Sequence, residues 1–512
     1  MTINLTTPGV YVTEIPSGVH TISGVATSIT AFIGRALRGP VDQAVTITSY
    51  GDFERIYGGL WTQSHLGYSV RDFFRLGGGT AVIVRVHNQA AATDTATLTV
   101  GSSTAALKLK AASPGTWGSK LSATETASVG APDATYFDLT VTDAGTGVTE
   151  VFRQVSYDTN SVRRVDLVVA AGSTLVTVDT SAMPTTAAAA YPVTSAAATI
   201  GGDGNALGYA QIMGATASKT GMYALDTVDL FNLLVIPPYY PGTGDMSTWD
   251  IEASNVVSDA QAYVLKRRAV LLLDAPTSWS NVAKAVTGAG TSPYDRGDHT
   301  AVYFPRIVEP DPLRNGQTMT FAPTGAVAGI IAATDANRGV WKSPAGIDAA
   351  LGGVTSLAIP LTSDDIGALN PLGVNCLRLA PAAGHVVWGA RTKDGDDRLA
   401  SDWKYLAVRR TALFLEESLY RGLQWAVFEP NDEPLWASIR LNVGAFMNNL
   451  FRQGAFQGTS PKDAYFVKVD KDTTTQTDIN LGVVNILVGF APLKPAEFVI
   501  LRLQQIAGNV TV

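Results

Sequence analysis

Histidine and cysteine are the side chains best suited to nucleophilic and metal chemistry, and this chain has few of them. It carries five histidines and one cysteine, Cys376, in 512 residues. No two histidines stand three or four positions apart, the spacing that places two metal ligands on one face of a helix. A single thiol excludes an intramolecular disulfide framework and a cysteine zinc cluster. The sequence therefore predicts no metal site and no cofactor.

The common catalytic loop motifs are missing as well. The sequence contains no GxSxG, GxxxxGK[ST] or HExxH string, so the signatures of hydrolase elbows, phosphate loops and zinc proteases all fail. The glycine-rich run GGDGN at Gly201 does not open a helix after a strand, and we interpret it as a turn. Cys376 lies in the apolar string GVNCLRLAP, which favours an inert buried thiol over a nucleophile. These patterns indicate that the protein is not an enzyme.

Two groups of carboxylates could do acid–base or calcium chemistry, but each has a simpler interpretation. Asp394, Asp396 and Asp397 lie in one loop that is similar to part of a calcium loop, although the bidentate glutamate at its twelfth position is missing. We expect a solvated turn there. Asp364 and Asp365 stand where a helix should begin, and carboxylates in a first helical turn cap free amide groups. Neither group predicts catalysis.

The charge balance argues against a general nucleic-acid binder. Lys and Arg number 37 and Asp and Glu 44, for a net charge of −7, and charged residues make up only 16% of the chain against 46% apolar residues. An outer surface so poor in charge indicates large protein–protein contacts. The amino terminus lacks the basic and apolar regions of a signal peptide, and every apolar run is too short to cross a membrane. We therefore expect a soluble protein with no membrane insertion.

Strands and helices alternate in two separated parts of the chain, residues 25–89 and 201–360. The first part has a core strand around Ile29 to Ile33 and an amphipathic helix that follows His65. The second has apolar strands around Val235 and Leu272, with helices between the strands. Together these elements predict an α/β core domain with a parallel sheet covered by helices.

Residues 90–200 interrupt this core with a different composition, rich in Ala, Thr, Ser and Gly. Alternating strings such as TYFDLTVTD can bury one face, which favours a folded β-rich domain over disorder. We expect a β-rich inserted outer domain.

Residues 361–495 predict an α+β C-terminal domain. A first helix should run from Ser401 to Gly422, and a second should begin at the NDEP turn, where Asn431 or Asp432 caps the helix and Pro434 lies in its first turn. Strands should follow in the strings AYFVKVD and VVNILVGFAP.

Each terminus carries one short apolar strand without a neighbouring strand in the sequence. We assign residues 1–24 to an N-terminal arm and residues 496–512 to a C-terminal arm. Unpaired backbone groups of an ordered strand must be satisfied by another chain, so we predict strand exchange between subunits. The candidate subunit-linking residues are Val10, Tyr11, Val12, Thr13, Phe498, Val499, Ile500 and Leu501.

Several strings together are similar to one known family. The opening TPGVYVTEIPSG, the central TDANRGVWKSPAG, and then LNPLGVNCLRL, WKYLAVRR, GLQWAVFEPNDEPLW and FAPLKPAEFVILRLQQ follow one another in that family's order. The chain thereby resembles the contractile tail sheath proteins of bacteriophages and of contractile injection systems. The resemblance skips residues 90–200, a variable outer insertion in the family.

The resemblance implies an assembly role. Its subunits stack as hexameric rings around an inner tail tube, and the sheath contracts to drive the tube through a target cell envelope. The implied partners are other copies of the chain, the inner tail tube protein, and baseplate and terminator proteins at the ends. The implied location is the bacterial host cytoplasm during assembly, and then a virion tail or a released particle.

The resemblance also implies a subtilisin-like fold for the central domain. A serine triad needs a histidine base, and residues 201–360 contain a single histidine, His299, without a serine motif to partner it. We therefore expect this fold without a catalytic triad. A cryptic α/β hydrolase and a surface-layer or adhesin-type protein stay open as alternatives.

The resemblance places the C-terminal domain against the inner tube. The helix expected from Ser401 to Gly422 offers charged positions on an apolar background, so its cations are candidate tube-facing residues: Lys404, Arg409, Arg410 and Arg421. An ion pair of Arg409 or Arg410 with Glu416 or Glu417 is the alternative that helical spacing leaves open.

Overall fold

The computed structural model describes residues 20–101, 106–131, 135–186, 190–252 and 255–502. The chain divides into two compact units, one formed by residues 26–410 and the other by residues 1–25 together with 411–512. We refer to them as the core unit and the C-terminal unit. The candidate linking residues Val10 to Thr13 lie outside the described residues.

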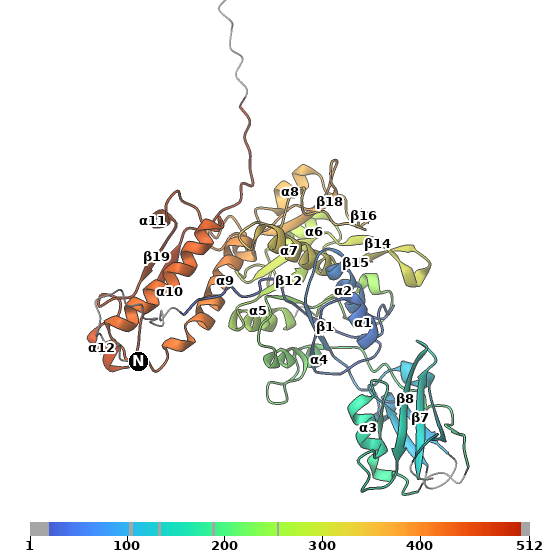
Figure 1. The fold of residues 1–512 in the computed structure, drawn as a ribbon. Helices are drawn as coiled ribbons and strands as arrows, with labels where there is room; N and C mark the ends of the chain where they lie inside the picture. The colour runs from blue at the N-terminus through green and yellow to red at the C-terminus, as the bar shows by residue number, and fades with distance from the viewer. Residues whose placement is uncertain (1–19, 102–105, 132–134, 187–189, 253–254, 503–512) are drawn as a thin grey trace, which may run out of the picture. The chain divides into compact units, whose positions relative to one another are not determined.

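An eight-stranded sheet forms the centre of the core unit (Figure 1). Its strands lie in the order β18, β17, β13, β12, β11, β1, β3 and β2. Their bounds are β1 Thr30–Gly34, β2 Ala44–Ile47, β3 Ala81–Arg85, β11 Leu233–Val235, β12 Val270–Asp274, β13 Thr300–Phe304, β17 Val374–Ala380 and β18 Gly384–Val387. The six inner strands are parallel, and β2 and β18 are antiparallel at the edges. The predicted parallel sheet is confirmed, and β17 and β18 extend it past residue 360, where the sequence had suggested a new domain.

The inner strands are apolar along their whole length because helices cover both faces of the sheet. The helices are α1 Tyr50–Tyr57, α2 Leu66–Arg75, α4 Tyr209–Met213, α5 Val256–Lys266, α6 Val282–Ala289, α7 Thr324–Arg338 and α8 Ser363–Leu369. Helices α2 and α7 pack very closely, since a Cβ atom added at Gly325 would stand 2.4 Å from the carbonyl oxygen of Ser69. Only glycine allows this approach. A smaller sheet beside them consists of β14 Ile307–Asp311, β15 Gln317–Phe321 and β16 Ser356–Leu357.

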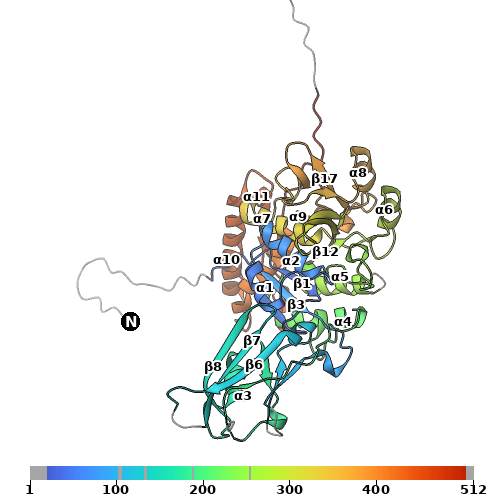
Figure 2. The same cartoon turned by 90° about the vertical axis from the view of Figure 1, so that its right-hand side faces the viewer.

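The insertion folds as two small sheets around a hydrophobic core of its own. One sheet has the order β10, β6, β7, β8 and the other β4, β5, β9. Their bounds are β4 Thr97–Val100, β5 Leu107–Ala111, β6 Leu121–Ala127, β7 Tyr136–Asp143, β8 Val148–Ser156, β9 Val176–Val178 and β10 Val193–Thr194, with one helix, α3 Val165–Gly172. Strands β6, β7 and β8 lie side by side in Figure 2. The described part of the insertion is thus β-rich, as its alternating strings predict.

The C-terminal unit contains two long helices and a hairpin. Helix α9 (Leu406–Gly422) starts in the core unit and continues into this one, and it is followed by α10 Glu433–Arg452, α11 Pro461–Ala464, β19 Tyr465–Lys468, α12 Gln476–Asn480 and β20 Leu487–Phe490. Asp432 is the N-cap of α10 and Pro434 lies in its first turn, so that predicted helix start is confirmed. Helix α9 begins five residues after Ser401, because the Ser401 hydroxyl accepts a hydrogen bond from the Trp403 amide in a turn of its own. Within the described part of the chain, no helix combines the length and the apolar character needed to span a bilayer.

Candidate functional site

The end of the described chain presents a strip of apolar side chains to solvent. Phe498, Val499, Ile500 and Leu501 are each between 75% and 88% exposed. Burying a side chain of this size contributes about 1.5–3 kcal/mol, so four consecutive exposed ones leave a large stabilising term unused in the single chain. The segment forms no strand within its own chain. Pairing of this segment with another chain therefore stays a prediction.

The hairpin before this strip has open edges. Strands β19 and β20 pair antiparallel with each other, from Tyr465 opposite Phe490 to Lys468 opposite Leu487, and each has this one strand partner among the described residues. Phe466 and Leu487 are exposed on the hairpin. Exposed edge strands offer free N–H and C=O groups that can extend a sheet into another chain. The hairpin and the strip together form the candidate subunit-linking site.

Two of the four candidate tube-facing residues are buried, so the prediction that they present charge at the surface is wrong. The Arg410 guanidinium donates to both carboxylate oxygens of Asp335, at 2.5 and 2.9 Å, and to the carbonyl oxygen of Thr27. Arg409 lies with its guanidinium carbon 4.5 Å from the centre of the Trp403 ring. Both arginines are buried within the core unit, where they hold the first turns of α9 against it.

The two remaining candidates are more accessible and already paired. Lys404 Nζ lies 2.5 Å from an oxygen of Asp397, and Arg421 Nε lies 2.8 Å from an oxygen of Glu417. The second pair has the i, i+4 helical spacing, but it uses Arg421 instead of the Arg409 or Arg410 that the sequence suggested. Partly exposed pairs of this kind contribute about 0.2–1 kcal/mol. Lys404 and Arg421 remain candidates for a weak outer contact.

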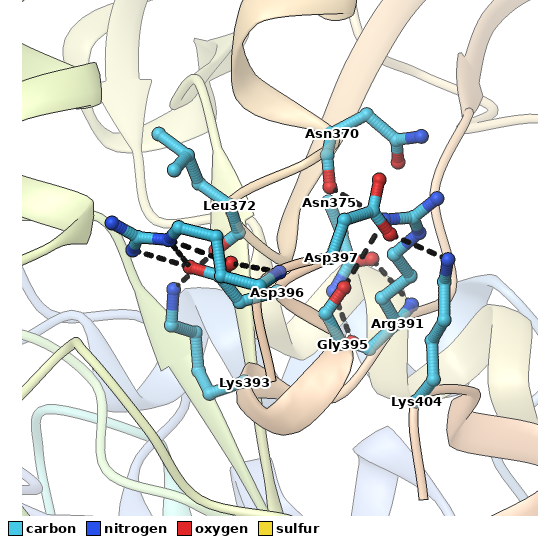
Figure 3. Close-up of polar contacts among 10 residues, drawn as sticks. Asn370, Leu372, Asn375, Arg391, Lys393, Gly395, Asp396, Asp397 and Lys404 are labelled. Carbon is cyan, nitrogen blue, oxygen red and sulfur yellow. Dashed lines mark hydrogen bonds and ion pairs between the residues drawn. The ribbon is translucent and has the colours of Figure 1, made fainter. Parts of the chain in front are cut away.

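The loop at residues 391–398 is held by a network of polar contacts, which we call the polar lock (Figure 3). Residues 391–393 and Asp396 are buried, whereas Asp397 and Arg398 are exposed, so the solvated turn we expected is present only in part. Arg391 Nη1 donates to the carbonyl oxygens of Asn370 and Gly395 and to the Asp397 carboxylate, at 2.9 to 3.1 Å. Asp396 is buried and bonded to the Arg398 guanidinium. The structure therefore uses these aspartates to hold the loop together. In the described part of the chain, no group of three or more His, Cys, Asp or Glu side chains could hold a metal ion.

Lys393 is the least expected member of this lock. Its ammonium group is buried and donates to the carbonyl oxygens of Leu372, at 2.6 Å, and Ala289, at 3.3 Å. Burial lowers the pKa of Lys393 to about 8, because the charged form loses its hydration. The lock ties α6, the segment before β17 and the segment before α9 to one another. No motif in the sequence indicates the contacts of Lys393, since their acceptors are backbone carbonyl groups that any residue supplies.

His299 cannot serve as the free base of a serine triad. Its Nε2 lies 2.7 Å from Arg409 Nη2 and its Nδ1 lies 2.7 Å from an oxygen of Asp298. Arginine only donates, so Nε2 accepts and Nδ1 carries the proton that is donated to Asp298. Both ring nitrogens are thus engaged, and the ring helps to hold the start of α9.

The remaining sequence candidates have structural roles. Cys376 is buried in β17, and burial raises the pKa of its thiol to about 12, which leaves it protonated and inert at neutral pH. Thr362 and Asp365 form a reciprocal capping box at the start of α8, as the carboxylates at that position predicted.

Comparison with known proteins relates the central and C-terminal parts of the chain to one family. Residues 249–393 match the family model of the phage tail sheath protein central domain, and residues 400–506 match that of the phage tail sheath C-terminal domain. A putative prophage major tail sheath protein of Pseudomonas aeruginosa (strain UCBPP-PA14) is 27% identical over 299 residues, which are 55% of this chain and 68% of that protein. The tail sheath protein of Vibrio phage KVP40 is 30% identical over 127 residues, 25% of this chain and 18% of that protein.

Solved structures share the fold over nearly the whole chain. The sheath of the extracellular contractile injection system PVC, in its contracted state, has a TM-score of 0.59 at 21% identity and covers 99% of both chains. The contracted helical sheath of the anti-feeding prophage has a TM-score of 0.59 at 23% identity over 98% of this chain and 100% of that one. A sheath tail protein of Listeria innocua has a TM-score of 0.61 at 13% identity over 92% and 96%.

The mixed α/β fold and these matches define a structural sheath subunit of contractile tails and injection systems, a class that is not enzymatic. The chain belongs to the phage tail sheath family.

Proposed function

We propose that this chain polymerises as stacked hexameric rings around an inner tail tube and that the resulting sheath contracts to drive the tube through a target cell envelope. The exposed strip Phe498–Leu501 carries the proposal, because it is an apolar strand-forming sequence that its own chain leaves uncovered. Strand exchange between subunits, by this strip and by the arm that contains Val10 to Thr13, would bury it. Main-chain hydrogen bonds then link neighbouring subunits.

The partners follow from the same proposal. They are other copies of the chain, the inner tail tube protein, and baseplate and terminator proteins at the ends of the sheath. Assembly takes place in the bacterial host cytoplasm, and the finished sheath is part of a virion tail or of a released particle. The energy for contraction comes from an extended lattice that relaxes to one with more buried contact, so no nucleotide is consumed.

In this proposal the core unit moves as one rigid body, and its fold is one that is also found in enzymes. Its central part is a subtilisin-like fold without a catalytic triad, in keeping with the engagement of both nitrogens of His299. The polar lock and the buried arginines of α9 make the start of that helix stiff. A stiff α9 would pass a rotation of the core unit on to the C-terminal unit.

Electron microscopy of truncated chains tests strand exchange. We expect the complete chain, expressed with its tube, to form regular sheaths. Chains that lack residues 1–18, or residues 498–512, should stay folded with an unchanged circular dichroism spectrum and form no sheaths. Regular sheaths from either truncated chain would show that strand exchange is not the link.

We also propose that residues 90–200 lie on the outside of the sheath, away from the contacts that hold it. The insertion has its own hydrophobic core, and one of its contacts with the rest of the core unit, the Arg38–Asp143 ion pair, lies outside the strands of the core sheet. It is anchored by Arg85, whose guanidinium donates to the carbonyl oxygen of Pro114. A chain in which a short linker replaces residues 95–195 should still form sheaths. A folded chain that no longer assembles would place the insertion in a subunit contact.

A further inference from the structure

Phe428 is the most conspicuous unused feature of the C-terminal unit. It lies between α9 and α10, and its accessible surface is 103% of the reference value, so its ring contacts nothing in the described chain. Val427 beside it is exposed as well. Neither the fold nor the strand-exchange site uses these two side chains.

The backbone conformation at Phe428 is also unfavourable for a large side chain. The Glu429 amide donates to the carbonyl oxygen of Ala426, which closes a four-residue turn with Val427 and Phe428 at its centre. Val427 has φ −71° and ψ 130°, and Phe428 has φ +72°. These angles belong to a type II turn, whose third position favours glycine because other side chains are strained there. The chain thus places a bulky aromatic residue where both its backbone and its solvation are unfavourable.

The turn is held firmly on both sides. Asn431 accepts a hydrogen bond from the Trp436 indole at 2.9 Å and donates to the carbonyl oxygen of Val483 at 3.0 Å. On the other side, the Trp425 ring stacks on His20 with 4.1 Å between ring centres. A rigid exposed aromatic side chain is already in its bound geometry and loses little entropy on binding. Phe428 therefore has the properties of a binding anchor.

We propose that Phe428 is the anchor by which each subunit grips the inner tube, where it enters an apolar pocket rimmed by lysine or arginine. This inference rests on the proposed function. Glu429 and Asp432 beside the anchor are exposed and acidic. The residues around the pocket that receives the Phe428 ring should therefore be basic.

The size of the contact favours the tube over a neighbouring sheath subunit. Two exposed side chains bury far less than the roughly 800 Å² per partner of a stable interface, so one such contact cannot hold two proteins together. Repeated along a tube, it holds by multivalency and releases when the sheath widens. A link between sheath subunits must survive that widening, and strand exchange is suited to it.

Cross-linking within intact particles tests the partner. The photo-reactive residue p-benzoylphenylalanine is placed at position 428 and, as a control, at Leu481, which is 73% exposed in the same unit. After irradiation, mass spectrometry should find position 428 joined to the protein that remains as a bare tube when the sheath is stripped. An adduct between two copies of this chain, an adduct with the tube at Leu481 as well, or no adduct at position 428 would overturn the proposal.

Substitution separates binding from folding. Phe428→Gly suits the turn, so it should unfold at the same or a higher urea concentration than the parent chain and yet give at least ten-fold fewer sheathed tubes. Phe428→Ala should show the same loss of sheathed tubes, and Leu481→Ala should stay within two-fold of the parent. A wild-type yield from both Phe428 variants, or a less stable Phe428→Gly chain, would overturn the proposal. Failure of the parent chain itself to surround a tube would instead overturn the proposed function.

Discussion

Two apolar runs of four residues show how differently this chain treats similar sequences. Residues 270–273, VLLL, form most of β12 and are at most 1% exposed, whereas residues 498–501, FVIL, form no strand and are at least 75% exposed. The first run has β11 and β13 on its two edges. The second has no such neighbours among the described residues. The difference lies in the strand partners, and under the proposed strand exchange another subunit supplies those of the second run.

Charge reversal at Arg410 should have the largest effect on stability, because it tests whether the start of α9 is part of the buried core. Arg410→Glu places two carboxylates together at Asp335, in a site that excludes water. Breaking a buried pair costs about 3–5 kcal/mol. We expect a loss of at least that size in the free energy of unfolding, measured by urea titration.

Arg55→Glu on α1 is the control. Arg55 and its partner Asp52 form an ion pair in which the arginine side chain is 73% exposed, so the urea midpoint of this variant should stay close to that of the parent chain. Equal urea midpoints for Arg410→Glu and the parent chain would contradict the burial of the Arg410–Asp335 pair.

Truncation of the buried run should have the next largest effect. Leu272→Ala leaves a cavity in β12, and such substitutions cost about 2–5 kcal/mol. Leu265→Ala, on the exposed face of α5, should change the free energy of unfolding by less than about 0.5 kcal/mol. Similar urea midpoints for the two variants would mean that the sheet is not the core of the folded subunit.

Continuous apolar runs and capping signals made part of this fold predictable from the sequence. The strand at Leu272 and the helix that starts at Asp432 are specified by residues within a few positions of each other. Local patterns also predicted the capped start of α8 and the inert Cys376. Here local preference and tertiary structure agree.

Contacts between distant residues could not be predicted in the same way. The Arg410–Asp335 pair spans 75 positions, and nothing near Arg410 distinguishes a buried arginine from an exposed one. The contacts of Lys393 use backbone carbonyl groups and leave no sequence signal. The tail was expected to be a strand, but a strand needs a hydrogen-bonding neighbour, and the described part of the chain supplies none for residues 498–501.

Asp274, the last residue of β12, should make the free energy of unfolding depend on pH. Residues 498–501 carry no titratable side chain and cannot do so. Burial raises the pKa of Asp274 to about 6, against the hydrogen bonds from Thr324 and the attraction of Arg306, which lower it, while Asp250 adds to the rise. The folded state thus favours the protonated form. Its contribution to stability is complete below pH 4 and is lost as the pH rises through about 6.

Each unit of pKa difference corresponds to about 1.4 kcal/mol, so the loss between pH 4 and pH 7 should be about 1–3 kcal/mol. Asp274→Asn removes this titration, and Thr324 can still bond to the amide. Urea titrations at several pH values should show a slope for the parent chain that exceeds that of the variant by this amount. Parallel stability curves would mean that Asp274 titrates alike in the folded and unfolded states.

Proline scanning of the tail should have the smallest effect on stability and a decisive one on assembly. Val499→Pro and Ile500→Pro each remove one backbone N–H but keep the segment apolar, and the segment makes no strand in its own chain, so the free energy of unfolding should change by less than about 0.5 kcal/mol. The N–H groups of adjacent residues in a strand point to opposite edges. If the tail adds to a sheet of another subunit along either edge, one of the two prolines must therefore remove a ladder hydrogen bond, and that variant should form no sheaths in electron micrographs. Val162→Pro serves as the assembly control, because Val162 is exposed at the second position of the turn that the Arg164 amide closes on the carbonyl oxygen of Ser161. Normal sheaths from both tail variants would mean that subunits are joined by side-chain packing of the FVIL strip, without the main-chain pairing that completes β12.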